Sequence, residues 1–368
     1  MLTEKEKYRY DRHLRMEEIG QAGQEKLKSS SVLVIGAGGL GCPALMYLAA
    51  AGVGKIGVMD FDSVNETNLQ RQILFTTNDV GNNKAESAKN RLAQLNKLIN
   101  VEAYSYKLTT KNALELFSKY DLILDATDNF STRYMINDAS IISGKPLIYG
   151  SVYKFEGQVS VFNYRNGPSY RCLFPDPAKN IPSCEEVGVL GVLCGIIGTK
   201  QANEALKIIL GIGNPLSGRL EIFNTLSGES LILKIKRNDE LVKYILETKS
   251  GFETFNYDLF CGIEQEKTNS ISASQFQLLL KEKSIQVYDI RQDWEDPKLQ
   301  YADCIKLPME NIEAAAELLS RTKKIVVICQ FGSRSKVAVD YLKAKHEFVD
   351  VVNLDGGMAE MERLGLFY

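Results

Sequence analysis

Short apolar runs alternate with amphipathic stretches through the first half of the chain. The runs predict buried strands at residues 32–35, 55–59, 101–106, 122–125 and 146–149. Between them, apolar residues recur at helical spacing and predict helices over residues 40–51, 84–98 and 129–143. Strands separated by helices are typical of a parallel, doubly wound α/β sheet. We therefore predict a Rossmann-like fold, in which a ligand binds at the carboxyl ends of the strands.

The pattern differs on either side of this alternating region. Residues 2–28, ahead of the first strand, are expected to be helical. Residues 157–163 and 219–237 have the character of antiparallel strands, and a proline-rich loop is expected at 168–183. Residues 188–210 are nearly all apolar, which predicts a helix buried against the sheet or against another subunit.

A second unit is expected near the C-terminus. Residues 238–267 are charged and then aromatic, without a clear period, and are typical of a connection. From residue 271, helices and strands alternate again, which predicts a smaller α/β domain. We accordingly assign residues 1–245 to a first domain, 246–268 to a linker and 269–368 to a second domain.

Composition narrows the setting. A length of 368 residues suits two domains, and a formal net charge of −2 gives no general attraction for nucleic acid or a membrane surface. The N-terminal residues are charged and the longest apolar runs are broken by glycine, so we expect neither a signal peptide nor a membrane span. Seven cysteines without a CxxC pair argue against a disulfide framework and favour a cytoplasmic protein with free thiols. Only two histidines are present, so histidine is a poor candidate for metal binding or general-base catalysis.

A glycine-rich turn follows the first predicted strand. Gly36, Gly38 and Gly41 form a GxGxxG pattern, with Gly39 inside it. Such a turn lets backbone N–H groups approach phosphate oxygens at a helix N-terminus. Asp60 ends the second predicted strand, about twenty residues further on, where an acid that binds ribose is expected.

The residues after Asp60 bear on which nucleotide binds there. The glycine turn alone favours a nicotinamide or flavin enzyme, but Arg71 and Lys84 add two cations that suit a triphosphate. Asp128 can carry Mg²⁺, which prefers carboxylate and phosphate oxygens. We therefore expect ATP. Taken singly, Arg71 or Lys84 is more simply explained as a surface charge paired with a nearby acid. The alternative function for the whole chain is an NAD-binding oxidoreductase with an appended sulfur-handling domain.

Several separated motifs resemble one family. They are GAGGLG at 36–41, DFDSVNETNLQRQ at 60–72 and ATDN at 126–129, with RHLR, EGQVSVF, YRCLFP and SCEEVGVLG also in order across residues 8–236. This pattern resembles the MoeB/ThiF/HesA family of ubiquitin-activating-like adenylyltransferases. The resemblance implies a homodimer that binds ATP and Mg²⁺. It also implies adenylation of the C-terminal glycine of a small ubiquitin-like sulfur carrier, of the MoaD or ThiS type, that ends in Gly-Gly.

The resemblance also implies roles for individual residues. The expected nucleotide-binding residues are Gly36, Gly38, Gly39, Gly41, Asp60, Asp62, Asn68, Arg71, Lys84, Asp128 and Asn129. Asp60 would bind the ribose, Arg71 the phosphates and Asp128 the metal ion. Arg12 matches the family arginine that reaches the triphosphate from the neighbouring subunit. The attacking carboxylate is already ionised, so this chemistry needs shielding of charge and alignment more than a general base.

Two cysteine positions of the first domain need separate interpretation. Many relatives hold a structural zinc with two CxxC pairs, but here Ser169 takes the leading position and Cys172 stands alone. We therefore predict that this zinc is absent, and we expect the apolar helix at 188–210 to supply packing instead. Cys184 matches the reactive cysteine that links some relatives to their carrier, and an ordinary loop cysteine is the alternative.

The second domain contains one cysteine in a distinctive setting. Cys329 ends a predicted strand, and the segment CQFGSRS leads directly into a helix. Converging backbone N–H groups and Arg334 would stabilise a thiolate or a persulfide there. The simpler reading is a buried strand-end cysteine with a solvated arginine.

The same segment resembles a rhodanese domain over residues 271–368. The resemblance is carried by YDIR at 288–291, by CQFGSRS, and by LDGGMAEM near the C-terminus. It implies a persulfide on Cys329. Gln330 replaces an arginine that is common beside this cysteine, which argues against thiosulfate as the sulfur donor.

Together the two domains resemble MOCS/Uba-type sulfur-carrier activators. We expect adenylation of the carrier, followed by sulfur transfer from Cys329 to form a thiocarboxylate, with an upstream donor such as a cysteine desulfurase. Cys184 would serve as an intermediate link or a resolving thiol. Molybdenum cofactor synthesis, thiamine synthesis and tRNA thiolation all use this chemistry. A non-catalytic scaffold that holds a carrier protein is a further alternative.

Overall fold

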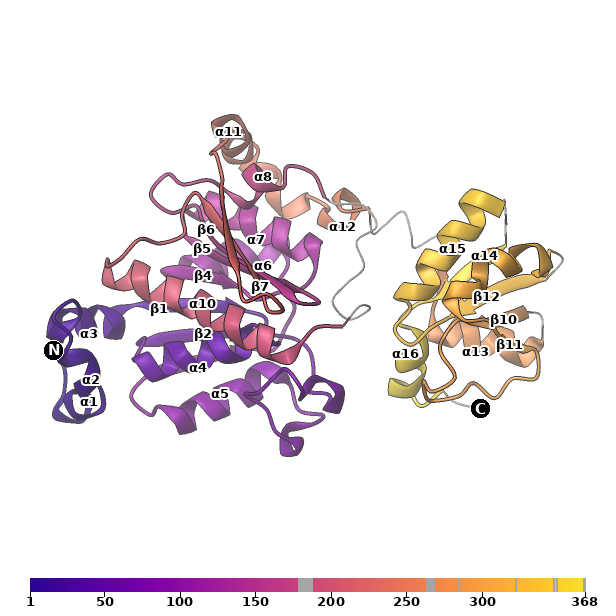
Figure 1. Cartoon of the computed structure of the whole chain (residues 1–368), viewed down its shortest axis with the longest axis horizontal. Helices are drawn as coiled ribbons and strands as arrows, with labels where there is room; N and C mark the ends of the chain where they lie inside the picture. The colour runs from indigo at the N-terminus through magenta and orange to yellow at the C-terminus, as the bar shows by residue number, and fades with distance from the viewer. Residues whose placement is uncertain are drawn as a thin grey trace. The chain divides into compact units, whose positions relative to one another are not determined.

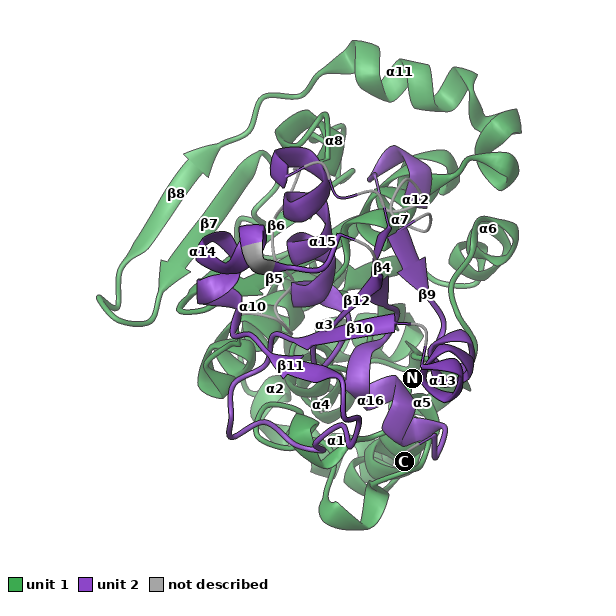
Figure 2. Ribbon diagram, turned by 90° about the vertical axis from the view of Figure 1, so that its right-hand side faces the viewer, with its two compact units in different colours: residues 1–257 green, residues 258–368 purple. Residues whose placement is uncertain are grey.

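The chain divides into two compact units, Met1–Tyr257 and Asp258–Tyr368 (Figure 2). The structure is a computed structural model, and it describes residues 1–177, 188–262, 269–283, 285–321, 323–346, 348 and 350–366. None of the helices in these ranges combines the length and the low polarity that crossing a bilayer requires.

The first unit is built on an eight-stranded sheet with the order β3-β2-β1-β4-β5-β6-β7-β8 (Figure 1). Its strands are β1 (Ser31–Ile35), β2 (Lys55–Met59), β3 (Asn100–Tyr104), β4 (Leu122–Asp125), β5 (Leu147–Tyr153), β6 (Glu156–Phe162), β7 (Arg219–Asn224) and β8 (Ser230–Lys234). The strands β1 to β5 pair in parallel, and β6 to β8 extend the sheet in antiparallel fashion. The predicted doubly wound sheet is confirmed, with the expected antiparallel extension.

Helices pack around this sheet. They are α1 (Glu4–Arg9), α2 (Asp11–Leu14), α3 (Gly20–Ser29), α4 (Gly41–Ala51), α5 (Lys84–Leu95), α6 (Thr110–Ser118), α7 (Phe130–Ser143), α8 (Tyr170–Leu173), α10 (Gly191–Leu210) and α11 (Asp239–Glu247). Short 3-10 helices are η1 (Glu66–Asn68), η2 (Thr77–Asp79) and η3 (Lys249–Thr254). The N-terminal segment, expected to be helical, forms three helices: α1 ends before Tyr10, whose φ of −97° and ψ of 18° depart from helical values, and residues 15–19 separate α2 from α3.

The core of the first unit lies where α4, α5 and α10 cover the sheet. Val32 and Val34 of β1 are fully buried in this core, and the alternating Leu33 is buried outside it. Strands buried on both faces read as continuous apolar runs, which explains why the sequence predicted them well. Helix α10 packs closely on α4, since a Cβ atom at Gly198 would lie 2.2 Å from the Leu40 carbonyl oxygen.

The end of the first unit departs from the predicted linker. Val242 and Ile245 of α11 pack against Ile141 of α7. The hydroxyl of Tyr257 donates a hydrogen bond to the buried Asp138 at 2.8 Å. The structure therefore divides after Tyr257 rather than after residue 245, because buried Tyr257, beyond the predicted boundary, also docks onto α7.

The second unit has a five-stranded parallel sheet with the order β11-β10-β12-β13-β9. Its strands are β9 (Ser270–Ile271), β10 (Ile285–Asp289), β11 (Cys304–Lys306), β12 (Lys324–Ile328) and β13 (Val351–Leu354). Its helices are α12 (Tyr257–Phe260), which begins at the division, α13 (Ala273–Glu282), α14 (Ile312–Ala315), α15 (Ser333–His346) and α16 (Gly357–Arg363), with 3-10 helices η5 (Met309–Asn311) and η6 (Ala316–Leu318).

Two cores cover the faces of this smaller sheet. In β12, Ile325 and Val327 belong to one core, and Val326 and Ile328 belong to the other. This alternation follows from the two-residue period of a strand. The sheet is therefore sandwiched between helices, as the predicted α/β domain requires.

Candidate active sites

The first candidate site lies where the strand order of the large sheet changes direction. Strand β1 has β2 on one side and β4 on the other, and Ile35 is in register with both Met59 and Asp125. The carboxyl ends of these three strands therefore meet at one edge, where ligands bind in doubly wound sheets. Gly36 and Asp60 follow directly at this edge, where the sequence predicts the nucleotide site.

The glycine turn is shaped by close approach of the backbone. A Cβ atom at Gly41 would lie 2.0 Å from the Gly36 carbonyl oxygen, and one at Gly39 would lie 2.9 Å from the Cys194 sulfur. Gly36 has φ +95°, which favours glycine. The turn thus exposes peptide groups at the N-terminus of α4, where the helix dipole attracts anions.

Asp60 is held in one orientation beside this turn. Its carboxylate accepts hydrogen bonds from Ala37 N–H at 2.8 Å and Asp62 N–H at 2.9 Å. Burial raises the pKa of Asp60. The positive charge of Lys84 lowers this pKa again, but only in part, so it stays above its ordinary value. The carboxylate keeps lone pairs free to accept further bonds, as a ribose-binding acid must.

Of the two predicted cations, Lys84 lies near Asp60 and Arg71 lies beside the glycine turn. Lys84 opens α5, and its ammonium nitrogen is 3.3 Å from Asp62 Oδ2. The Arg71 side chain passes beside the glycine turn, since its Cγ would be 3.6 Å from a Cβ atom at Gly39. Arg71 N–H donates to the Asn68 carbonyl at 3.1 Å, which ties Arg71 to η1. The structure thus places Arg71 beside the turn, Asn68 next to Arg71 through the backbone, and Lys84 beside the acids that follow β2.

Asp128 and Asn129 follow β4 at this edge, and both are exposed. The Asn129 side-chain oxygen accepts a hydrogen bond from Thr132 N–H at 2.9 Å and caps α7. Asn129 therefore has a structural role in addition to its predicted place in the site. Arg12 is not brought to the crevice, because its side chain is 86% exposed and its guanidinium lies 3.8 Å from Asp11.

Three buried side chains at this edge were not predicted. Gln72 is only 4% exposed, and its Nε2 would lie 3.8 Å from a Cβ atom at Gly38. Gln201 of α10 donates to the Asp125 carbonyl at 2.6 Å, and Arg133 of α7 donates to the Thr127 carbonyl at 2.6 Å. The sequence did offer a sign that Gln201 is important, because it is a polar residue within a nearly all-apolar helix.

Each of these side chains keeps a buried polar atom without a hydrogen bond. Within the described part of the chain these atoms are Gln72 Oε1, Gln201 Oε1 and Arg133 Nε. Buried polar atoms normally have partners, so such atoms mark a place for water or a ligand. Donors from the turn, two cations and an acid that can reach a ribose make this crevice fit a nucleoside triphosphate.

The predictions about Cys184, Cys172 and the structural zinc have different outcomes. Cys184 lies outside the described residues. The Cys172 sulfur accepts hydrogen bonds from Ser169 N–H and Asn238 N–H, both at 3.3 Å. Helix α11 packs at this corner, whereas α10 packs on α4, so the expectation that α10 supplies the packing there was wrong. Residues 1–177, 188–262 and the described part of the second unit contain no group of three or more His, Cys, Asp or Glu side chains placed to hold a metal ion.

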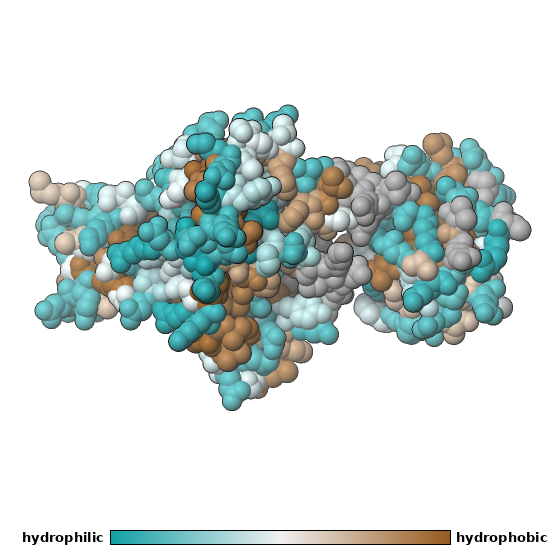
Figure 3. All heavy atoms as spheres, turned by 90° about the horizontal axis from the view of Figure 1, so that it is seen from above, coloured by the Kyte–Doolittle hydropathy of each residue, from teal (hydrophilic) through white to brown (hydrophobic). Residues whose placement is uncertain are grey.

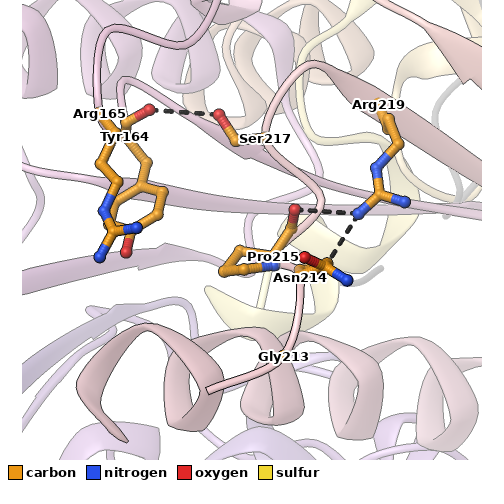
Figure 4. Close-up of a pocket in the computed structure, with 7 residues that line it drawn as sticks. All are labelled: Tyr164, Arg165, Gly213, Asn214, Pro215, Ser217 and Arg219. Atoms are coloured by element: carbon orange, nitrogen blue, oxygen red, sulfur yellow. Dashed lines mark hydrogen bonds between the residues drawn. The ribbon is translucent and has the colours of Figure 1, made fainter. Parts of the chain in front are cut away.

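The depression shown in Figure 4 lies elsewhere on the first unit. It has a volume of about 440 Å³ and is lined by Tyr164, Arg165, Gly213, Asn214, Pro215, Ser217 and Arg219. Phe162, at the end of β6, pairs with Leu147 at the start of β5, so this depression is at the sheet edge opposite the glycine turn. It contains none of the predicted site residues.

The second candidate site surrounds Cys329. This fully buried cysteine follows β12, and its sulfur accepts hydrogen bonds from Gly332 N–H at 3.1 Å, Ser335 N–H at 3.4 Å and Ser335 Oγ–H at 3.2 Å. The first turn of α15 supplies part of this cradle. The predicted convergence of backbone donors on the sulfur is therefore present, and it suits a thiolate or a persulfide.

The cations beside Cys329 differ from the expectation. Arg334 donates to Glu295 Oε1 at 2.8 Å, and its second nitrogen also bonds that carboxylate. This hydrogen bonding, and less strongly the nearby Cys329, raises the pKa of Arg334. Arg334 is therefore not the solvated arginine of the simpler alternative, because it is paired with Glu295 and also interacts with Cys329. Buried Arg291 forms two bonds of 2.9 Å to Asp289 and donates to Gln330 Oε1 at 2.9 Å.

The fold and the two sites define a nucleotide-binding α/β domain joined to a small domain with a cradled cysteine. Residues 10–243 match the ThiF family, and residues 272–363 match the rhodanese-like domain. The chain belongs to the ThiF family and carries a C-terminal rhodanese-like domain.

Named relatives share most of the chain. It is 39% identical to the probable adenylyltransferase/sulfurtransferase MoeZ of Mycobacterium tuberculosis, over 97% of this chain and 93% of that protein. It is 48% identical to the sulfur carrier protein adenylyltransferase of Thermus thermophilus, over 71% of this chain and 98% of that protein. It is 40% identical to the adenylyltransferase and sulfurtransferase MOCS3 of Anopheles gambiae, over 91% of this chain and 81% of that protein.

Solved structures show the fold of the first unit. MccB of E. coli is similar with a TM-score of 0.56 and 21% identity, over 62% of this chain and 72% of that chain. The predicted fold class is confirmed, and the named relatives confirm the predicted class of activity, an adenylyltransferase combined with a sulfurtransferase. They do not favour the oxidoreductase alternative. Membership of the ThiF family implies use of ATP.

Proposed function

We propose that the first unit adenylates the C-terminal carboxylate of a ubiquitin-like sulfur carrier and that the second unit supplies sulfur from a Cys329 persulfide. The observation that carries this proposal is the grouping of Arg71 and Lys84 with the glycine turn around Asp60. Two cations at a helix N-terminus suit a triphosphate better than the diphosphate of a dinucleotide.

The proposed adenylation needs each group of the crevice in one role. N–H groups around Gly39 and the N-terminus of α4 hold phosphate oxygens, and Asp60 accepts bonds from the ribose hydroxyls. Arg71 and Lys84 neutralise charge that shifts toward the departing pyrophosphate. The carrier carboxylate attacks the α-phosphorus, pyrophosphate leaves, and an acyl adenylate remains.

The proposed adenylation also needs a metal ion and an arginine from a second copy of the chain. Mg²⁺ would be held by Asp128 together with phosphate oxygens, and it would supply further shielding of charge. This fits the exposed position of Asp128, since Mg²⁺ usually takes only one or two protein carboxylates. Arg12 is exposed, and among the described residues its only ion-pair partner is Asp11, so we propose that it serves the nucleotide site of a second copy in a homodimer.

The proposed sulfur transfer follows adenylation. The outer sulfur of the Cys329 persulfide attacks the acyl carbon, and AMP leaves with the electrons of the C–O bond. The product is an acyl disulfide between the carrier and Cys329. The thiol of Cys184 then attacks the Cys329 sulfur, which releases the thiocarboxylate and forms a Cys184–Cys329 disulfide that an external thiol reduces. We propose that the connection between the two units permits this delivery.

A surface of the first unit supports a protein substrate or partner. Strand β8 is the last strand of the sheet, and all of its residues are exposed, including Leu231, Ile232 and Leu233. Figure 3 shows apolar side chains gathered on the surface of this unit. An exposed apolar edge strand is open to pairing with another chain, so this strand suits protein contact.

The test is pyrophosphate release from the full chain with ATP, Mg²⁺ and a small carrier ending in Gly-Gly. We expect release that depends on the carrier, together with calorimetric binding of ATP and no binding of NAD. NAD binding without ATP binding would support the oxidoreductase alternative. ATP-dependent capture of a carrier without pyrophosphate release would support a scaffold. The mass of a carrier that copurifies with the chain would assign the pathway among molybdenum cofactor, thiamine and tRNA thiolation.

A further inference from the structure

The cations around Cys329 are held by carboxylates. Glu295 is only 9% exposed, and its carboxylate accepts hydrogen bonds from both terminal nitrogens of Arg334. Its Oε1 also accepts a hydrogen bond from Gln292 N–H at 2.8 Å. Burial raises the pKa of Glu295, but the hydrogen bonds from Arg334 and Gln292 outweigh burial and leave this pKa below its ordinary value. Glu295 is therefore an anion that stays with Arg334.

The second guanidinium near the loop is occupied as well. Arg291 is fully buried, binds both oxygens of Asp289 and donates its remaining terminal nitrogen to Gln330. Lys306 also lies 3.2 Å from Asp289. The Cys329 sulfur accepts hydrogen bonds from the N–H groups of Gly332 and Ser335 and from the Ser335 hydroxyl, and Arg334 also interacts with it while bound to Glu295.

This arrangement discriminates between donors by charge. Thiosulfate is a dianion, and a site that accepts it needs a cation available beside the attacking sulfur. A persulfide carries at most one charge on its sulfur, which a cradle of backbone N–H groups can satisfy. Arg334, at 29% side-chain exposure, is near enough to solvent to meet a donor but is committed to Glu295.

We propose that Glu295 is a specificity-determining residue that, by holding Arg334, makes Cys329 accept sulfur from a persulfide donor and discriminate against thiosulfate. The inference rests on the proposed role of Cys329. In the step, the Cys329 thiolate attacks the outer sulfur of a donor RS–SH, the S–S bond breaks and RS⁻ leaves with the electron pair. Cys329 becomes a persulfide, and the proton stays on the transferred sulfur. With thiosulfate the same bond change would expel sulfite.

The test compares two donors on the full-length chain, with cyanide as the sulfur acceptor. In the unmodified protein, kcat/KM for cysteine persulfide should exceed that for thiosulfate by at least about a hundredfold. Glu295→Gln should raise kcat/KM for thiosulfate by about tenfold, the size of a charge-assisted hydrogen bond that the donor gains from Arg334. It should change kcat/KM for the persulfide by less than about threefold, because those contacts are unchanged.

Two further variants separate this role from a general disturbance. Glu360→Gln removes a similar carboxylate from the Arg363 pair on α16 and should leave both donors unaffected. The double variant Glu295→Gln/Arg334→Gln should lose the gain with thiosulfate. The single tryptophan, Trp294, is 78% exposed beside Glu295, so its fluorescence reports whether this loop stays folded.

The outcomes distinguish the inference from the function on which it rests. Equal use of the two donors by the unmodified protein would overturn the role of Glu295, and so would a folded Glu295→Gln variant without any gain for thiosulfate. If neither donor loads sulfur onto Cys329, the proposed role of that cysteine fails, and the inference fails with it. Pyrophosphate release needs neither donor and is measured separately.

Discussion

The two reactive centres use the same local unit, a parallel strand followed by a loop and a helix, but their polar groups are satisfied differently. In the nucleotide crevice, buried atoms of Gln72, Gln201 and Arg133 have no hydrogen-bond partner in the described part of the chain. Around Cys329, the sulfur accepts three hydrogen bonds, and Arg334 is paired with Glu295. The first centre is built to be completed by a large polar ligand, and the second is organised before its sulfur arrives.

The carboxylates of the two centres also differ in how far nearby cations compensate their charge. Burial raises the pKa values of Asp60 and Asp125 above the ordinary value, and the cations Lys84 and Arg133 offset this only in part. Burial also raises the pKa of Asp289, but its bonds to Arg291 leave the net pKa below the ordinary value. A crevice that awaits a ligand leaves its acids partly uncompensated, whereas a preorganised loop pairs them.

The largest effect should come from removing one reactive group of each centre. Asp128→Ala should reduce pyrophosphate release to background, because the proposed metal ligand is lost. Cys329→Ala should leave pyrophosphate release intact and abolish thiocarboxylate formation, measured by the mass of the carrier. Cys304→Ala is the control. Burial is the main cause that raises the pKa of the Cys304 thiol to about 11, which makes it a poor nucleophile. Loss of adenylation in Cys329→Ala would contradict the division of labour.

A large effect on the second centre alone should follow from filling its tightest point. Gly357 has φ +61°, and a Cβ atom there would lie 2.4 Å from the Cys329 carbonyl oxygen. Gly357→Ala should lower the free energy of unfolding of the second unit by about 3 kcal/mol or more, since both strain and clash arise. Differential scanning calorimetry should show its transition shifted and that of the first unit unchanged.

Gly365 is the matched control for this substitution. It has φ +64°, and a Cβ atom there would meet no atom within 4 Å. Gly365→Ala should therefore cost only about 1 kcal/mol, from the left-handed conformation alone. Equal destabilisation by the two substitutions would show that the loop around Cys329 is not tightly packed.

A smaller effect should test whether the nucleotide crevice awaits a ligand. Gln72→Leu removes a buried amide whose oxygen has no partner, so the free energy of unfolding without ATP should change by less than about 1 kcal/mol. The Kd for ATP should rise about tenfold if the ligand provides that partner. Gln201→Leu is the contrast, because it breaks a 2.6 Å bond to the Asp125 carbonyl and should cost about 1–3 kcal/mol even without ATP. Unchanged ATP affinity in Gln72→Leu would remove Gln72 from the site.

The smallest effect should be an opposite response of the two centres to acid. The paired acids Asp289 and Glu295 have lowered pKa values, so their stabilisation is complete above about pH 4.5 and is lost as pH falls through the folded-state values. Asp60 and Asp125 have raised pKa values, so their favourable contribution is present below about pH 3.8 and is lost as pH rises.

Thermal unfolding between pH 3 and pH 7 checks this response. Glu295→Gln should flatten the pH dependence of the second unit's transition on the acidic side. Asp125→Asn should flatten the dependence of the first unit's transition at higher pH. If neither substitution alters the pH dependence of its own unit, the contrast in electrostatics between the two centres is wrong.

Much of the fold could be predicted because it depends on short-range patterns. The predicted bounds of β2 and β4 equal the observed ones, since fully buried strands appear as uninterrupted apolar runs. Helix α6 was missed, although Thr109 and Asn112 form a capping box at its start. In the second unit the alternation is less regular than predicted, because residues 312–318 are divided between the short helix α14 and the 3-10 helix η6.

The linker shows where composition misleads. The charged segment around α11 contains two buried apolar residues, Val242 and Ile245, at helical spacing. Their value for packing depends on Ile141 of α7, about a hundred positions earlier in the chain. The sequence around α11 contains no information about that partner, so the connection described at 238–267 begins too early.

The sequence by itself determined the class of fold, the two domains, the glycine turn and the cysteine loop. These features depend on residues that are neighbours along the chain, and their spacing carries the chemistry. Only the tertiary structure decided which polar groups are paired. Glu295 meets Arg334 across 39 positions, and Gln201 meets the carbonyl of Asp125 across 76. Electrostatic and hydrogen-bond energies depend on distance in space, which the local pattern along the chain does not specify.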